Sequence, residues 1–261
     1  MSTAHTDPTP VRPTNRVTLS VVMPAYNEEG AIADAVRDVQ EHVFPVVPDA
    51  ELVVVDDGSR DKTGAILDGL ADSEPRLRVI HKANGGHGPA LRTGLDAASG
   101  EFVFLIDSDR QIPLTAFPPL WEAARTRDGA FGVRKTRHDA RLRLILTAVI
   151  RTAIRPLLGV KIYDANIPFK VIRRSVWLRA EPLIPPDTLA PSLFLAVFAR
   201  RAGYDVAEME VPHKDRETGT VSIRRWKLLK FCARAFRQLL AFRSRLDRAL
   251  KSHPAPLAAP H

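Results

Sequence analysis

Short apolar runs alternate with longer amphipathic stretches between residues 19 and 106. The runs are rich in β-branched and aromatic residues, which favours strands, and the stretches repeat apolar residues at helical spacing. The strand candidates are Leu19–Met23, Leu52–Val55, Leu77–Ile80 and Phe102–Ile106, and the helix candidates are Glu29–His42, Asp61–Asp72 and Gly88–Ala98. Because strands that alternate with helices pair in parallel, the pattern predicts an α/β fold with one Rossmann-like, mainly parallel sheet flanked by helices.

The pattern becomes less regular after residue 111, but it predicts further elements. Helices are expected over Thr115–Thr126, Ala140–Leu158, Leu189–Arg201 and Ile223–Leu250, and strands near Gly129–Val133 and over Val206–Val211. Both ends of the chain lack an apolar period and contain several prolines, so we expect disordered tails at residues 1–16 and 253–261. Between them we expect one globular domain at 17–222 and a helix at 223–252.

Composition adds an excess of positive charge to this picture. The formal net charge is +8, and residues 221–251 contain ten lysines and arginines against one acid, Asp247. Such an excess indicates an anionic partner, and a nucleotide, a phospholipid surface and a nucleic acid all qualify. The single cysteine, Cys232, excludes an internal disulfide and a cysteine-based zinc cluster.

Polar segments follow each of the first four predicted strands. They are Pro24–Glu28, Asp56–Ser59, Asn84–Gly88 and Asp107–Gln111. In an open parallel sheet the ligand lies beyond the carboxyl ends of the strands. We therefore expect all four segments to meet at one edge of the sheet.

Two of these segments have the chemistry of a nucleotide site. Asp107 and Asp109 flank one residue and could hold a hard cation that neutralises a diphosphate. Alone, this motif is more often a solvated turn, so the interpretation depends on the neighbouring segments. The acidic pair Asp56 and Asp57 could accept hydrogen bonds from a base or ribose, while Gly58 allows a tight turn and Ser59 caps the next helix. Neither the dinucleotide glycine spacing nor a P-loop is present.

Together, the four ordered segments resemble family 2 glycosyltransferases, and most of all the polyprenyl-phosphate sugar synthases of the dolichyl-phosphate mannose synthase kind. The resemblance extends over roughly residues 19–222 and implies a GT-A fold, a catalytic domain at 17–222 and bound Mg²⁺ or Mn²⁺. One departure from the family pattern is Arg110, which stands where leucine usually follows the Asp-x-Asp motif.

The resemblance also implies roles for individual residues. Those expected to hold the nucleotide sugar are Pro24, Ala25, Tyr26, Glu28, Asp57, Asp107, Ser108 and Asp109. Those expected to hold the metal are Asp107, Asp109 and Gln111. Those expected to handle the phosphate groups of the acceptor are Arg134, Arg143, Thr147, Lys170 and Arg216. Asp109 and Arg134 are the expected catalytic residues.

The expected reaction is metal-dependent, inverting transfer of a sugar from a GDP- or UDP-linked donor to a polyprenyl phosphate. A phosphate monoester is largely dianionic at neutral pH, so it can attack without a general base. The histidines show no metal-type spacing and receive no role. Two alternatives remain: a transferase that acts on a soluble hydroxyl acceptor, and a non-catalytic adaptor that binds membranes or nucleic acid.

The C-terminal helix interleaves apolar residues with lysines and arginines, a pattern typical of helices that lie in a membrane interface. The alternative is packing against the sheet with the basic side chains reaching solvent. No nucleic-acid module is recognisable, so no nucleic-acid partner is expected. No signal peptide or spanning run of apolar residues occurs, and we expect a peripheral protein on the cytoplasmic membrane face. The oligomeric state stays open.

Overall fold

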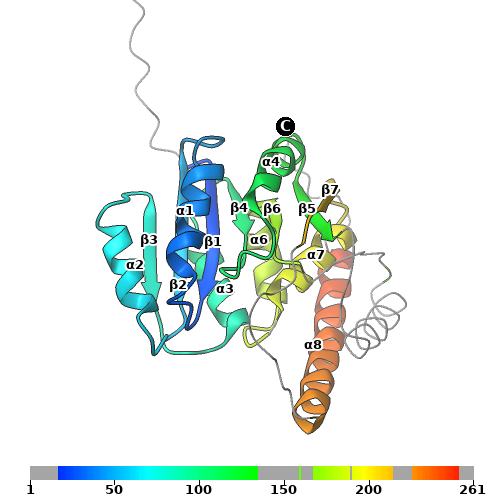
Figure 1. The fold of residues 1–261 in the computed structure, drawn as a ribbon. Coiled ribbons are helices and arrows are strands. Elements are labelled where there is room, and N and C mark those ends of the chain that lie inside the picture. Colours follow the sequence, from blue (N-terminus) through cyan, green and yellow to red (C-terminus); the bar gives the residue numbers. More distant parts are fainter. Residues whose placement is uncertain (1–16, 135–158, 160–166, 189, 214–224, 253–261) are drawn as a thin grey trace, which may run out of the picture.

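The computed structural model describes residues 17–134, 159, 167–188, 190–213 and 225–252, and the side chains of these residues except at 225–235. Seven strands form one sheet in the order β3-β2-β1-β4-β6-β5-β7 (Figure 1). The strands are β1 (Leu19–Ala25), β2 (Ala50–Asp56), β3 (Leu77–His81), β4 (Phe102–Leu105), β5 (Gly129–Arg134), β6 (Lys170–Arg173) and β7 (Val206–Val211). All neighbouring pairs are parallel except those of β6, which runs antiparallel to β4 and β5.

Helices cover both faces of the sheet (Figure 1). The helices are α1 (Ile32–His42), α2 (Thr63–Ala71), α3 (His87–Ala97), α4 (Phe117–Arg125), α6 (Arg174–Ala180), α7 (Pro191–Arg201) and α8 (Arg225–Ser252), with short 3₁₀ turns η1 (Leu114–Ala116) and η2 (Glu181–Leu183). The mainly parallel α/β sheet expected from the sequence is thereby confirmed. The predicted helix at 140–158 and both tails lie outside the described residues.

Two apolar clusters lie on opposite faces of the sheet and follow the period-two pattern of the strands. In β4, Phe102 and Phe104 belong to the cluster under α1 and α4, whereas Val103 and Leu105 belong to the cluster under α3 and α7. Successive side chains of a strand point to opposite faces, so a continuous apolar run fills both clusters. Because the central strands are buried on both faces, their positions are fixed. The loops at their carboxyl ends therefore start from defined positions.

Two details of the sequence prediction were wrong. The strand β6 and the helix α6 were not predicted, because the four residues of β6 lie among basic residues and carry little strand signal of their own. Ser59 does not cap α2, whose N-cap residue is Lys62 without a side-chain bond. The Ser59 hydroxyl instead accepts the backbone N–H of Asn27 at 3.0 Å, so it joins two loops.

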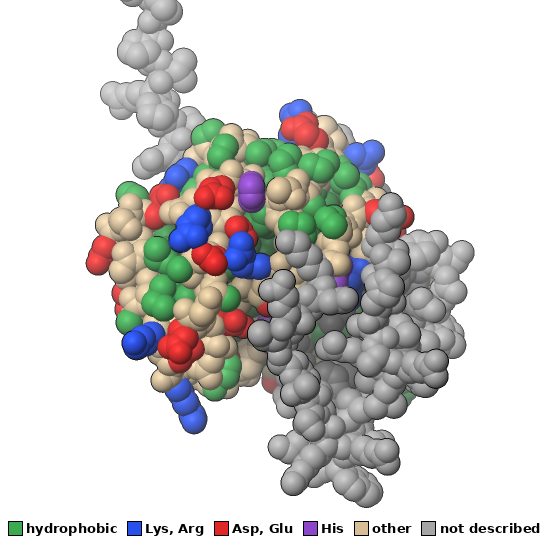
Figure 2. All heavy atoms as spheres, in the orientation of Figure 1, with side chains coloured by type: hydrophobic (Ala, Val, Ile, Leu, Met, Phe, Trp, Pro, Cys, Tyr) green, Lys and Arg blue, Asp and Glu red, His purple; other side chains and the backbone are tan. Residues whose placement is uncertain are grey.

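Helix α8 packs one face of its described part on α7. Leu239, Phe242 and Leu246 are buried, and Phe242 makes an edge-to-face contact with Phe194 at 4.8 Å between ring centroids. Phe236 is 49% exposed on the same helix. Among the described helices, none combines the length and hydrophobicity that crossing a bilayer requires. Acidic and basic side chains are interspersed over the described part of the face in Figure 2.

Candidate functional site

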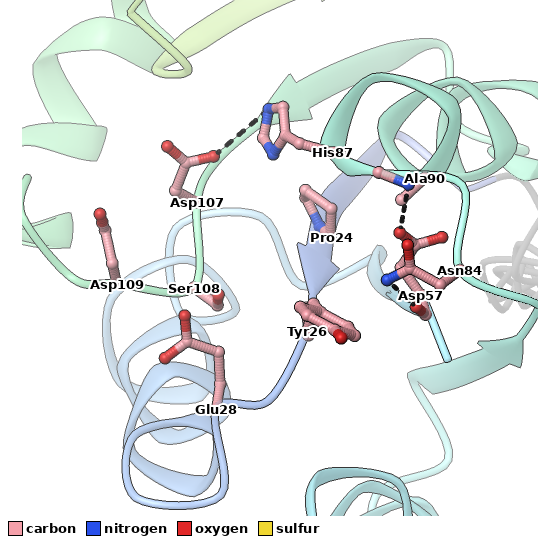
Figure 3. Close-up of a pocket in the computed structure, with 12 residues that line it drawn as sticks. Pro24, Tyr26, Glu28, Asp57, Asn84, His87, Ala90, Asp107, Ser108 and Asp109 are labelled. Atoms are coloured by element: carbon pink, nitrogen blue, oxygen red, sulfur yellow. Dashed lines mark hydrogen bonds and ion pairs between the residues drawn. The ribbon is translucent and has the colours of Figure 1, made fainter. Parts of the chain in front are cut away.

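A pocket of about 440 Å³ opens at the carboxyl ends of β1, β2 and β4, beside the start of α3 (Figure 3). The residues that line it are Pro24, Ala25, Tyr26, Glu28, Asp57, Asn84, Gly86, His87, Ala90, Asp107, Ser108 and Asp109. All eight residues that the sequence assigned to a nucleotide sugar are among them. The convergence follows from the parallel pairing of β1 with both β2 and β4, which brings their carboxyl ends to the same edge.

Hydrogen bonds join the loops after β1 and β2. Asn27 adopts a left-handed φ of 54°, and its side-chain oxygen accepts the backbone N–H of Arg60 at 2.8 Å. The next N–H, of Glu28, donates to the hydroxyl of Thr63 at 2.8 Å. These bonds hold Tyr26 and Glu28 at one wall of the pocket, where the Tyr26 ring stays 42% exposed and available to a ligand.

Asp57 organises the part of the pocket next to Tyr26 and the glycine-rich loop (Figure 3). Its buried carboxylate accepts the ammonium of Lys82 at 2.6 Å and the backbone N–H groups of Gly85 at 2.9 Å and Gly86 at 2.6 Å. Gly58 has a φ of 70°, and a side chain there would come within 2.8 Å of the backbone nitrogen of Asn84. Asp57, which was predicted to bind a nucleoside, therefore also shapes the glycine-rich loop.

His87 was missed as a pocket residue by the sequence analysis. It is the first residue of α3, and its Nε2 lies 3.9 Å from Oδ1 of Asp107 (Figure 3). The side chain of His87 is 49% exposed, but the part that lies in the pocket loses solvent, which lowers the pKa of His87; the nearby charges of Asp109 and Asp57 only partly oppose this effect. A neutral imidazole is therefore favoured near pH 7. The sequence did contain a signal for this residue, because His87 belongs to the Asn84–Gly88 segment that follows a predicted strand. No role was assigned to any single residue of that segment.

The loop after β4 presents two carboxylates to the pocket. Asp107 and Asp109 both line it, and Oδ1 of Asp109 accepts the backbone N–H of Gln111 at 3.2 Å. Two carboxylates that open onto one cavity supply the oxygen ligands that Mg²⁺ or Mn²⁺ requires, so the residues fit a divalent cation. Gln111, the third expected metal ligand, does not line the pocket.

A second acidic grouping lies on α1, outside the pocket. Asp38, Glu41 and His42 each bring a potential ligand atom within 4.8 Å of the others. Both carboxylate oxygens of Asp38 already accept hydrogen bonds from Arg110. The carboxylates that face the pocket are therefore the better candidates for a cation that acts on a bound ligand.

Two of the residues expected at the acceptor phosphate, Arg134 and Lys170, are described by the structure, and neither lies in the pocket lining. Arg134 is the last residue of β5 and Lys170 the first of β6. Lys170 is fully buried, and its ammonium donates to the Ser192 hydroxyl at 2.9 Å and to the carbonyl of Ile167. The remaining three, Arg143, Thr147 and Arg216, lie outside the described residues.

Comparisons with known proteins agree with this geometry. The model of glycosyl transferase family 2 matches residues 20–177, a range that includes every loop of the pocket. The undecaprenyl-phosphate 4-deoxy-4-formamido-L-arabinose transferase of Pseudomonas aeruginosa (strain LESB58) is 28% identical over 214 residues, which cover 81% of this chain and 62% of that protein. The protein of the same name from Pseudomonas fluorescens (strain Pf0-1) is 29% identical, over 77% of this chain and 58% of that one. This chain thus matches about three fifths of the length of these relatives.

Solved structures share the architecture. Glucosyl-3-phosphoglycerate synthase from Mycobacterium tuberculosis, in complex with Mn²⁺, UDP-glucose and phosphoglyceric acid, has a TM-score of 0.64 and 24% identity over 87% of this chain and 80% of that one. TarS from S. aureus has a TM-score of 0.56 and 20% identity over 76% of this chain and 37% of that one. At these identities the likeness concerns the fold alone, and it confirms the expected GT-A fold.

Proposed function

The chain belongs to glycosyl transferase family 2, and from this premise we propose that it transfers a sugar from a UDP-linked donor to a polyprenyl phosphate. The observation that carries the proposal is the pocket, in which all eight residues expected at a nucleotide sugar lie together. The UDP-glucose bound to the structural relative supports the choice of nucleotide, and the undecaprenyl-phosphate relatives support the choice of acceptor.

We assign the nucleoside to the wall formed by Pro24, Tyr26 and Asp57. The exposed face of Tyr26 offers a stacking surface, and Oδ2 of Asp57, which among the described residues accepts only the backbone N–H of Gly86, can accept one more hydrogen bond. Helix α3 begins at His87, with Gly86 as its N-cap residue. The N-terminus of a helix favours an anionic group, so we assign the diphosphate to this place. The donor would then extend from Tyr26 toward Asp109.

We assign a divalent cation, Mg²⁺ or Mn²⁺, to Asp107 and Asp109, which line the pocket; Gln111, the third ligand expected from the sequence, does not line it. When bound, such an ion supplies Lewis-acid neutralisation of the departing diphosphate. The protein contributes two things: it holds the two carboxylates in place, and it puts the neutral ring of His87 beside them. A positively charged side chain at that place would compete with the metal ion for the carboxylates.

In the proposed reaction, an oxygen of the acceptor phosphate forms a bond to the anomeric carbon of the sugar. The bond from that carbon to the diphosphate oxygen breaks, its electron pair leaves with the nucleoside diphosphate, and the configuration inverts. No general base is needed because the attacking oxygen carries charge. Arg134 remains the described candidate to orient the acceptor phosphate, together with Arg143, Thr147 and Arg216 of the undescribed segments.

The soluble-acceptor alternative has one observation in its favour. Attack by a hydroxyl requires a base, and the pocket contains His87, whose lowered pKa keeps it able to accept a proton near neutral pH. An assay with both acceptor classes therefore decides between a lipid phosphate and a hydroxyl acceptor.

The test is a transfer assay with the full chain, UDP- and GDP-linked sugars, undecaprenyl phosphate and simple soluble sugars, with Mn²⁺, Mg²⁺ or EDTA. We expect product only with UDP-sugar, undecaprenyl phosphate and a metal. Asp109→Asn is expected to reduce transfer at least a hundredfold, and Asp72→Asn, an exposed acid outside the pocket, to leave it unchanged. Full activity of the Asp109 variant, or transfer to soluble hydroxyls alone, would contradict the proposal.

We further propose that the protein works as a peripheral protein at the cytoplasmic membrane face, through α8. The exposed Phe236 and Leu240 and the basic side chains around them suit an anionic leaflet, where each lysine or arginine near the surface contributes about 1 kcal/mol. A lipid-linked acceptor would then be met where it resides.

A further inference from the structure

Arg110 does not face the pocket, although it stands beside Asp109. It has a φ of 57°, in the left-handed region that side chains rarely adopt. Among the described non-glycine residues, only Arg110 and Asn27 have positive φ, and both lie in loops that border the pocket. An unfavourable backbone conformation persists where surrounding contacts enforce it, and it is often found at functional sites.

The contacts that hold Arg110 come from helix α1. Its Nε donates to Oδ2 of Asp38 at 2.6 Å, and its Nη2 donates to Oδ1 of the same carboxylate at 3.1 Å. A third bond runs from Nη1 to Asp34 at 3.0 Å. The Asp38 pair is bidentate, the geometry in which guanidinium and carboxylate bind most strongly and with a defined orientation.

These bonds connect two sides of the pocket. Helix α1 directly follows the segment that contains Tyr26 and Glu28, and Arg110 lies in the loop that contains Asp107 and Asp109. Asp34 and Asp38 are four residues apart and share one face of α1, so the guanidinium reaches both from a single position. They also neutralise a positive charge that would otherwise compete with a cation at the neighbouring carboxylates.

We propose that Arg110 is a positioning residue, which fixes the left-handed turn of its loop on α1 and thereby aims Asp107 and Asp109 into the pocket. The inference rests on the proposed donor site. The bonds require the guanidinium, because an apolar side chain at position 110 could not form them. Arg110 itself touches neither donor nor metal in this proposal.

The test uses the full chain and measures the affinity for Mn²⁺ in the presence of UDP, by electron paramagnetic resonance of free Mn²⁺, together with the KM for the UDP-sugar. We expect Arg110→Leu to weaken Mn²⁺ binding roughly tenfold, a size suited to a strong but partly exposed ion pair. Arg110→Lys should recover only part of this loss, since an ammonium cannot form the bidentate pair. Arg110→Gly, which favours the same φ without the side chain, should not restore binding.

Arg37→Leu is the matched control. Arg37 lies on α1 and pairs with the same Asp34 at 2.7 Å, but it does not reach the loop. It should change Mn²⁺ affinity less than twofold. Asp38→Asn should cause most of the loss of Arg110→Leu but not all of it, because the bond from Arg110 to Asp34 remains. The double variant should be no worse than Arg110→Leu alone, because Asp38 acts through Arg110. Unfolding midpoints of all variants separate this effect from general instability.

The outcomes distinguish this inference from the proposed function. If Arg110→Leu or Arg110→Gly binds Mn²⁺ and UDP as the wild type does, or if the losses of Arg110→Leu and Asp38→Asn add, the positioning role is wrong. If the wild type binds Mn²⁺ with UDP but transfers no sugar to undecaprenyl phosphate, only the proposed acceptor is wrong. If the wild type does not bind Mn²⁺ with UDP, the donor site and this inference fall together.

Discussion

Two buried charged side chains in this protein have different surroundings, although both were assigned to ligand binding from the sequence. Asp57 and Lys170 are both buried ionisable residues close to strand ends. Asp57 lines the pocket, whereas Lys170 directs its ammonium to Ser192 and to the carbonyl of Ile167. A buried polar group that loses its hydrogen-bond partner lowers the free energy of unfolding. Each of these residues therefore stabilises the fold only while all of its hydrogen-bond partners are present.

Lys170→Met provides a prediction at this scale. The substitution leaves the Ser192 hydroxyl and the Ile167 carbonyl without this donor, and we expect the free energy of unfolding to fall by about 1–3 kcal/mol. Urea denaturation measures it. If Lys170 acts only on structure, the KM for polyprenyl phosphate will stay within twofold of the wild-type value. A large rise in that KM with unchanged stability would instead support the phosphate-binding role expected from the sequence.

At the scale of elements, His81 joins two strands and a helix. It ends β3, its Nδ1 lies 2.9 Å from Asp56 at the end of β2, and its Nε2 lies 2.9 Å from Asp68 on α2. The hydrogen bond with Asp68 and then that with Asp56 raise the pKa of His81, while burial opposes them. For Asp56, burial acts to raise the pKa, but hydrogen bonds from Ser59 and His81 outweigh it and keep the pKa low.

The raised pKa of His81 predicts a pH dependence. Its stabilising effect is fully present below the unfolded-state value near 6.5 and is lost as the pH rises through the higher folded-state value. The Tm difference between the wild type and His81→Asn should therefore be largest near pH 6 and shrink toward pH 9. A difference that grows with pH would contradict the arrangement.

The docking of α3 supplies a second prediction for an element. A side chain at Gly94 would overlap Val22 of β1 and come within 3.2 Å of Val55 of β2. Gly94→Ala should therefore lower stability by about 1–2 kcal/mol, because overpacking outweighs the gain of about 1 kcal/mol in helix propensity. It should also weaken UDP binding, since α3 begins at the pocket. Gly69→Ala on α2, where no atom lies within 4 Å of the added carbon, is the control and should stabilise.

At the scale of the whole molecule, one face of α8 packs on the apolar cluster under α3 and α7. The large apolar side chains of Phe236 and Leu240 on the same helix stay exposed. We expect Phe236→Ser combined with Leu240→Ser to reduce flotation with phosphatidylglycerol vesicles at least tenfold, since each side chain would lose on the order of 1–2 kcal/mol of burial. Leu178→Ser, 50% exposed on α6, is the matched control. An equal loss in the control, or none in the double variant, would argue against α8 as the membrane contact.

The sequence by itself determined the mainly parallel sheet and most of the pocket. Apolar periodicity is a local property, and parallel pairing brings the polar strand ends together, so Pro24–Glu28, Asp57 and the two acids after β4 could be placed in advance. Only the tertiary structure decided the position of β6, the burial of Lys170, the place of His87 in the pocket and the direction of Arg110. These depend on partners distant in the chain: the Arg110–Asp38 bond joins residues 72 positions apart, and no local pattern of charge or hydrophobicity specifies such a pairing.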